Sequence, residues 1–86
     1  MTARYLASFQ HDFLRLPSAV QKKFQRQLII LLAHGVTYPG LNVRKMTGRQ
    51  SIWEARIGIH YRFTFQTIGD VILLRRIGTH EIYRHP

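Results

Sequence analysis

Polar side chains of complementary chemistry fall on one face of a β-sheet predicted in the second half of the chain. Successive residues of a strand point to opposite faces, so Glu54 shares a face with Arg56. On the next predicted strand, Arg62 shares a face with Thr64 in the same way. A carboxylate set between arginines suits phosphate binding with an acid or a base close by. The sequence therefore predicts a phosphate site on this face.

The polar end of the sequence adds side chains to this face. Beyond a strand predicted over Val71–Gly78, the chain continues Thr-His-Glu-Ile-Tyr-Arg-His-Pro, which brings His80, Tyr83 and Arg84 within reach of it. An imidazole gains and loses a proton near neutral pH, so His80 is a candidate acid. The alternative for His80 is a plain surface histidine.

The arginines and the carboxylate also have a purely structural interpretation. Arg56 and Arg62 could form exposed cross-strand ion pairs with Glu54. Such pairs contribute less than about 1 kcal/mol to stability.

The charge of the chain favours a polyanionic partner. Thirteen lysines and arginines stand against four acidic residues, which gives a net charge of +9 at pH 7. A small basic protein attracts phosphate at long range and releases counterions when it binds nucleic acid. Pairing with an acidic protein is the alternative, and the two are compatible.

Length and composition exclude several classes of protein. Eighty-six residues allow one domain, and the lack of cysteine excludes disulfides, thiolate metal sites and a cysteine nucleophile. The five histidines form no i, i+4 pair, so we expect neither a metal ion nor another cofactor. The longest apolar run has six residues, so export and membrane insertion are not expected.

The first half of the chain predicts one strand and two helices. Residues 2–9 mix β-formers with small residues, and apolar spacing predicts a short helix over residues 9–16. A longer helix is expected over Ser18–His34, where Ser18 and Gln21 would form a capping box.

The longer helix has two faces and a defined end. Its apolar stripe is expected to face the core and its basic side to face outward. Gly35 ends the helix, and residues 35–42 are expected to form a loop. The stripe consists of Val20, Phe24, Leu28, Leu31 and Leu32, and the basic side of Lys22, Lys23 and Arg26.

Three β-rich runs separated by glycines make up the second half. They cover residues 51–57, residues 59–66 and Val71–Gly78, and they predict an antiparallel meander. The fold class is therefore α+β: a small antiparallel sheet, made of this meander and the N-terminal strand, packed against an N-terminal helical pair. The side chains expected to face the helices are Trp53, Tyr61, Phe63 and Phe65.

Five segments carry a resemblance to a known family. They are Leu16-Pro-x-x-Val-Gln-Lys-Lys23, Ile52-Trp-Glu-Ala-Arg56, Tyr61-Arg-Phe-Thr-Phe65, Gly69-Asp70 and Ile77-Gly-Thr-His-Glu-Ile-Tyr83. In order and spacing they resemble the RelE/ParE superfamily of toxins from type II toxin–antitoxin systems, in particular the RelE-like messenger-RNA endonucleases. The resemblance covers nearly the whole chain and implies that residues 1–86 form one toxin domain.

The resemblance implies metal-independent cleavage of messenger RNA on the ribosome, in which the 2′-hydroxyl of the substrate attacks the neighbouring phosphate. By position, Arg62 would stabilise charge on that phosphate, Arg56 is a second basic position, and His80 would be the general acid. Tyr83 resembles a tyrosine that stacks on a base or assists proton transfer. Glu54 departs from relatives with lysine there, and is either the base or an ion-pair partner of Arg56 or Arg62.

The resemblance also implies partners. These are a cognate antitoxin, the ribosome with its messenger RNA, and promoter DNA bound through the toxin–antitoxin complex, all in the cytoplasm and without a membrane. The residues expected to contact RNA or the ribosome are Lys22, Lys23, Arg26, Lys45 and Arg84. For the three on the helix, a solvated face is the alternative.

Two other functions remain open at this point. A toxin of the ParE kind would inhibit DNA gyrase by binding it, without catalysis. A catalytically silent relative would act only as a DNA-bound autoregulator with its antitoxin, for which basic charge suffices.

Overall fold

The second half of the chain forms the predicted meander. The computed structural model describes residues 1–48 and 51–86, and in it β3 (Trp53–Ile57), β4 (Tyr61–Ile68) and β5 (Val71–Gly78) pair antiparallel in chain order. β3 and β4 each begin two residues later than predicted. Ser51, at φ 63°, lies in a turn, and a second turn begins at Gly58.

Two further strands widen the meander to five strands. β1 (Thr2–Tyr5) pairs parallel to β5, and β2 (Arg44–Lys45) pairs antiparallel to β3, so the order is β1-β5-β4-β3-β2. The sheet is therefore mostly, not wholly, antiparallel. The prediction missed β2, since a strand of two residues shows no alternation.

The predicted boundaries at the start of the chain are wrong. The strand ends at Tyr5 instead of residue 9, and α1 (Ala7–Leu14) begins two residues earlier than predicted. The Leu6 N–H still bonds to the Leu74 carbonyl at 2.9 Å, and the chain then turns into the helix. This early turn brings Phe9 into the core, where it is 1% exposed.

The helix α2 (Ser18–His34) has the predicted bounds but not the predicted cap. Pro17 is the N-cap residue, and its side chain has no polar atom that could cap the helix. Ser18, the predicted cap, is the first residue of the helix. Gln21 is used elsewhere: its Nε2 donates to the Phe13 carbonyl at 2.8 Å and ties the end of α1 to α2. Gly35, at φ 77°, ends the helix as expected.

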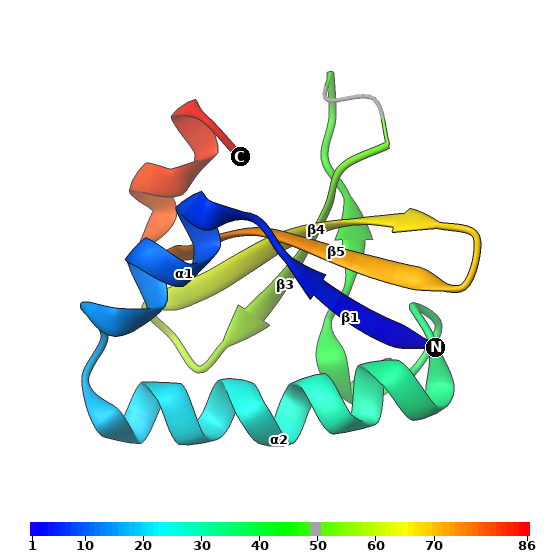
Figure 1. The fold of residues 1–86 in the computed structure, drawn as a ribbon, viewed down its shortest axis with the longest axis horizontal. Helices are drawn as coiled ribbons and strands as arrows, with labels where there is room; N and C mark the ends of the chain where they lie inside the picture. The colour runs from blue at the N-terminus through cyan, green and yellow to red at the C-terminus, as the bar shows by residue number, and fades with distance from the viewer. Residues whose placement is uncertain (49–50) are drawn as a thin grey trace.

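The core lies between the sheet and the helices. Figure 1 shows α2 below the sheet and η2 (His80–Arg84), in orange and red, above its opposite face. Phe24 of α2 meets Phe63 of β4 edge-on at 5.0 Å between ring centroids, and Phe9 of α1 meets Phe24 at 5.2 Å. Phe24, Leu28 and Leu31 of the predicted stripe are buried.

The loop after α2 contains one further element. The short 3₁₀ helix η1 (Pro39–Leu41) interrupts the predicted loop, and it buries Leu41. None of the helices in the described ranges is long and apolar enough to cross a membrane.

A β-bulge on β5 sets the direction of two arginines. Thr64 pairs with Arg76 and Phe65 with Leu74, so Arg75 is the extra residue between them. Because of this insertion, Leu74 and Ile77 both face the core although they are three positions apart. Arg75 bonds to Gln66 on the face opposite the helices, whereas Arg76 reaches α1.

Candidate active site

A polar groove of about 450 Å³ lies on the part of the sheet that the sequence singled out. Its charged side chains come from three neighbouring strands, β2, β3 and β4. Three of them are arginines and one is a carboxylate, so the groove is strongly electropositive. The lining residues are Asn42, Val43, Arg44, Glu54, Arg56 and Arg62.

Two of the arginines oppose each other in the sheet. Arg56 on β3 and Arg62 on β4 are direct partners in the antiparallel register. Like charges placed directly opposite each other destabilise a sheet. Among the described residues, Glu54 forms no ion pair with either arginine. The alternative prediction of cross-strand ion pairs from Glu54 to Arg56 or Arg62 is therefore wrong.

Glu54 pairs instead with Arg44, which the sequence analysis missed. The two residues are register partners on β2 and β3, and Arg44 Nε donates to Glu54 Oε1 at 2.5 Å. This hydrogen bond, and then the negative charge of Glu54, raise the pKa of Arg44. The only sign of this site in the sequence is the basic pair Arg44-Lys45 before Gly48. Two residues are too few to indicate a strand.

Tyr83 brings the segment after β5 to the groove. Its hydroxyl accepts a hydrogen bond of 2.8 Å from Arg62 Nη1, and the guanidinium carbon lies 5.5 Å from its ring centroid. Tyr83 also contributes a small part of the rise in the Arg44 pKa. The phenol oxygen therefore binds one arginine of the groove directly, Arg62.

His80 lies outside the groove lining. It is exposed, it begins η2, and it is absent from the lining. Residues three apart in a 3₁₀ helix lie on the same side, about 6 Å along the axis. His80 is therefore one turn before Tyr83 on the same side of η2.

The fold has been solved before in other proteins. No protein-family model matches the chain, and no curated protein matches its sequence. Among solved structures, the RelB-RelE antitoxin-toxin complex from Methanococcus jannaschii superposes with a TM-score of 0.78 at 21% identity, over 95% of this chain and 98% of that one. The chain has a RelE-like toxin fold.

Two further structures share the RelE-like fold. The YoeB dimer from Staphylococcus aureus gives a TM-score of 0.80 at 13% identity, over 93% of this chain and 97% of that chain. The isolated E. coli RelE toxin gives 0.73 at 17% identity, over 96% and 90% of the two chains. In all three comparisons the likeness covers at least 93% of this chain.

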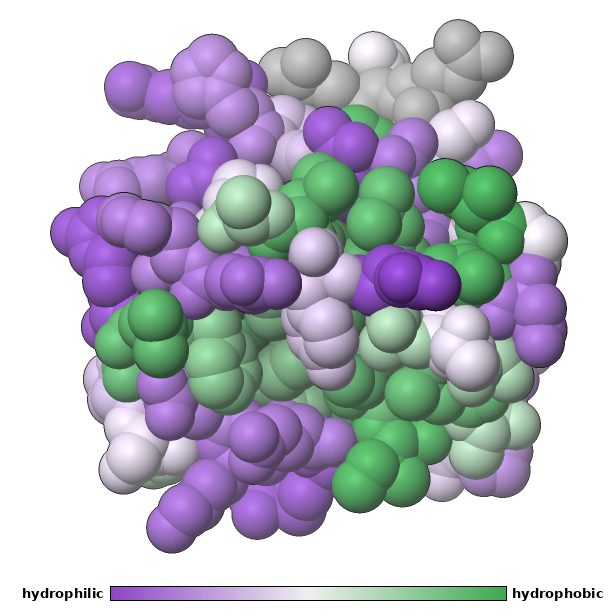
Figure 2. Space-filling model, viewed as in Figure 1, coloured by the Kyte–Doolittle hydropathy of each residue, from purple (hydrophilic) through white to green (hydrophobic). Residues whose placement is uncertain are grey.

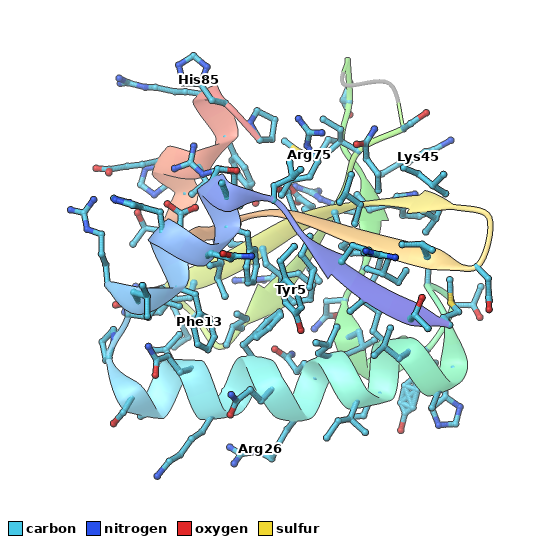
Figure 3. The ribbon with its side chains drawn as sticks, in the orientation of Figure 1. Tyr5, Phe13, Arg26, Lys45, Arg75 and His85 are labelled. Atoms are coloured by element: carbon cyan, nitrogen blue, oxygen red, sulfur yellow. The ribbon has the colours of Figure 1, made fainter. Side chains whose placement is uncertain are left out.

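The predicted RNA contacts lie at several places on this RelE-like fold. Lys22, Lys23 and Arg26 are exposed on α2, and Figure 3 shows Arg26 pointing away from the sheet. Lys45 follows Arg44 on β2 but points to the other face of the sheet, where its Nζ is 5.7 Å from the centroid of the Trp53 ring. Arg84 is exposed on η2 and lines a different cavity.

Two other cavities lie outside this groove. One, of about 390 Å³ between α1 and α2, has an apolar lining that includes Phe9, Phe13 and Phe24, and Figure 2 shows the apolar surface of this side in green. The other, of about 620 Å³ beside η2, contains the ion pair of Asp12 and Arg76 and further charged side chains, Arg15, Glu81 and Arg84. Within residues 1–48 and 51–86, no three His, Asp or Glu side chains lie close enough to share a metal ion.

Proposed function

We propose that this protein is the toxin of a toxin–antitoxin pair and that it cleaves messenger RNA on the ribosome. The observation that carries the proposal is the convergence of Arg44, Arg56 and Arg62 on one groove, with the last two directly opposed in the sheet. Opposed cations reduce stability on their own, and a bound phosphate would offset that loss.

The solved structures support the toxin role. RelE of Methanococcus jannaschii was solved in complex with its antitoxin RelB, and E. coli RelE was solved in its toxin–antitoxin complex. By analogy, the partner of this chain is an antitoxin that neutralises it in the cytoplasm. The complex would bind promoter DNA, for which the charge of +9 is suitable.

The proposed reaction is an internal transfer at phosphorus. The 2′-oxygen of the substrate forms a bond to the adjacent phosphorus, and the bond from phosphorus to the 5′-oxygen breaks, which leaves a cyclic phosphate. Arg62 and Arg56 stabilise the extra negative charge on the phosphate oxygens. His80, as imidazolium, gives its proton to the leaving 5′-oxygen from its position at the start of η2.

The remaining groups hold and deprotonate the substrate. The ring of Tyr83 stacks on a base or its hydroxyl assists proton transfer, and its hydrogen bond to Arg62 supports a role close to the phosphate. Two roles are open to Glu54: the base that takes the proton from the 2′-hydroxyl, or the partner that holds Arg44.

The ribosome supplies orientation that the groove lacks. In-line attack requires the sugar and the phosphate to be fixed together, and a groove with three arginines fixes mainly the phosphate. The exposed cations Lys22, Lys23, Arg26, Lys45 and Arg84 would contact ribosomal or messenger RNA. Free RNA is therefore expected to be a poor substrate.

The decisive experiment is a cleavage assay with purified components. The protein is mixed with programmed bacterial ribosomes and messenger RNA, and new RNA ends are mapped by primer extension. We expect cuts in the codon at the decoding site when ribosomes are present, and none with the same RNA alone. Arg62→Ala is the inactive control, and Glu81→Gln, a change on the exposed side of η2, is the control that keeps activity.

The outcomes separate the proposed function from its alternatives. A protein that arrests growth but makes no cuts on ribosomes is not an endonuclease, and inhibition of DNA gyrase would then be measured. Unchanged growth arrest by His80→Ala would likewise point to inhibition by binding. A protein that neither cuts nor arrests growth would fit the autoregulator.

A further inference from the structure

We infer that Glu54 is a positioning residue: it holds Arg44 over the groove for the phosphate and does not take the proton of the 2′-hydroxyl. The inference rests on the proposed function and decides between the two roles left open for this carboxylate. It adds Arg44 to Arg56 and Arg62 as a contact of the phosphate and leaves the 2′-hydroxyl proton to pass to solvent.

The first argument is the contrast in burial within the pair. The side chain of Glu54 is 7% exposed, whereas that of Arg44 is 74% exposed. The carboxylate is therefore at the floor of the groove, and the guanidinium that it holds is at the surface. A general base must reach the proton that it removes, within hydrogen-bond distance or through one water. Here the exposed partner of the pair is the arginine.

The second argument is the atom through which Arg44 is held. Its Nε donates to Glu54, and this hydrogen bond uses neither Nη group. A guanidinium has five N–H donors in a planar fork, so the outer edge keeps donors for a phosphate. Glu54 therefore fixes the direction of Arg44 without using up its binding edge.

The third argument is the weak backbone support of Arg44. Its strand β2 has two residues and stands at the edge of the sheet. A free arginine side chain loses up to about 2 kcal/mol of rotamer entropy when it is fixed. A buried carboxylate directly opposite in the register fixes it before the substrate arrives.

The fourth argument is the role of the carboxylate among three cations. Arg44, Arg56 and Arg62 line the same small groove and repel one another. Glu54 is the single acidic residue in that lining. Its side-chain oxygen gives one of the three guanidinium groups a fixed acceptor, a function that an amide oxygen can also serve.

The test compares four variants in the ribosome assay: Glu54→Gln, Glu54→Ala, Arg44→Ala and the double variant E54A/R44A. An amide oxygen can still accept the Nε–H, so we expect Glu54→Gln to cleave within about threefold of the wild type. Glu54→Ala and Arg44→Ala should each lose about tenfold, and the double variant should lose no more than either one. Glu81→Gln is the charge-matched control.

The base role makes opposite predictions. Loss of a general base costs about 10²- to 10⁴-fold, equally in Glu54→Gln and Glu54→Ala, and flattens the acidic limb of the pH–rate profile. A positioning role leaves that limb in place in Glu54→Gln. Loss of activity in Glu54→Gln together with near-normal activity in Arg44→Ala would overturn the inference.

A second readout does not depend on cleavage. Binding of a 2′-O-methyl RNA tetranucleotide, which cannot be cut, can be titrated by ¹⁵N NMR while the Nε–H signal of Arg44 is followed. We expect the signal to be protected in the wild type and Glu54→Gln, and both protection and affinity to fall in Glu54→Ala. Equal affinity in all variants would contradict the inference. If the wild type makes no cuts, the proposed function fails, and this titration still decides whether Glu54 positions Arg44.

Discussion

Five arginines of the sheet fall into two groups that are used in opposite ways. Arg75 and Arg76, at the bulge of β5, bond to protein acceptors: Arg75 to Gln66 and the Pro86 carbonyl, and Arg76 to both oxygens of Asp12 and the His85 carbonyl. The groove arginines have fewer such bonds. Arg44 is held through Nε, and Arg62 donates to one phenol oxygen.

The difference separates charge used for folding from charge kept for a ligand. Arg76 is 28% exposed and its partner Asp12 is 15% exposed, so their paired bonds join α1 to β5 in a partly dry environment. On the groove side, Arg62 Nε and Thr64 Oγ1 are buried without a hydrogen-bond partner among the described residues. Buried polar atoms without a partner lower stability, and they are characteristic of sites that bind a ligand or carry out catalysis.

The largest expected effect comes from Arg62 on the groove side. Arg62→Ala should lower ribosome-dependent cleavage by about 10²- to 10³-fold, as expected when one donor to the transition state is lost. The melting temperature should change little, because the variant also removes a like-charge opposition to Arg56. Single-turnover cleavage and thermal unfolding measure the two effects. A large drop in melting temperature with normal cleavage by the folded fraction would reverse the assignment.

The next effect is on the folding side. Arg76→Met should lower the free energy of unfolding by about 2 kcal/mol, because the partly buried Asp12 loses its charged partner. For a domain of this size, that corresponds to a fall in melting temperature of roughly 8–16 °C.

A double-mutant cycle provides the control for this pair. If Asp12→Ala and Arg76→Met act through the same contact, the double variant should be less destabilised than the sum of the single variants. Cleavage per folded molecule should stay within about threefold of the wild type in Arg76→Met. Simple additivity would show that the two side chains act separately.

The smallest effect concerns the buried hydroxyl next to the groove. Thr64→Val keeps the shape of the side chain and removes an oxygen that has no partner, so stability should rise by about 1 kcal/mol. Thermal unfolding measures the gain, and the cleavage rate should be nearly unchanged. A tenfold loss of cleavage without a gain in stability would mean that the hydroxyl takes part in the site.

The sequence predicted the elements with strong periodicity and failed where contacts are long-range. The bounds of α2 and β5 are as predicted, because an apolar stripe or a buried run defines each of them. The pairing of β1 beside β5 joins residues 69 positions apart, such as Thr2 and Val71, which no local pattern encodes. The predicted capping box does not form because the Gln21 side chain donates a hydrogen bond to the Phe13 carbonyl at the end of α1 instead.

The site was predicted in part for the same reasons. Strand alternation was enough to place Glu54, Arg56 and Arg62 on one face, and the groove lining contains all three. Arg44 was missed because its position depends on β2, which exists through pairing with β3 rather than through a pattern of its own. His80 stays a prediction, since its side chain is exposed outside the groove lining and its role depends on the bound substrate.

The parallel pairing of β1 with β5 has a consequence for the timing of synthesis. A nascent chain that has reached β4 holds the arginines of the groove but has no partner for β1 and no Tyr83. Closing the sheet must wait for contacts across almost the full length of the chain, which are slow to form. A partly translated chain therefore lacks the finished groove until β5 and η2 have been added.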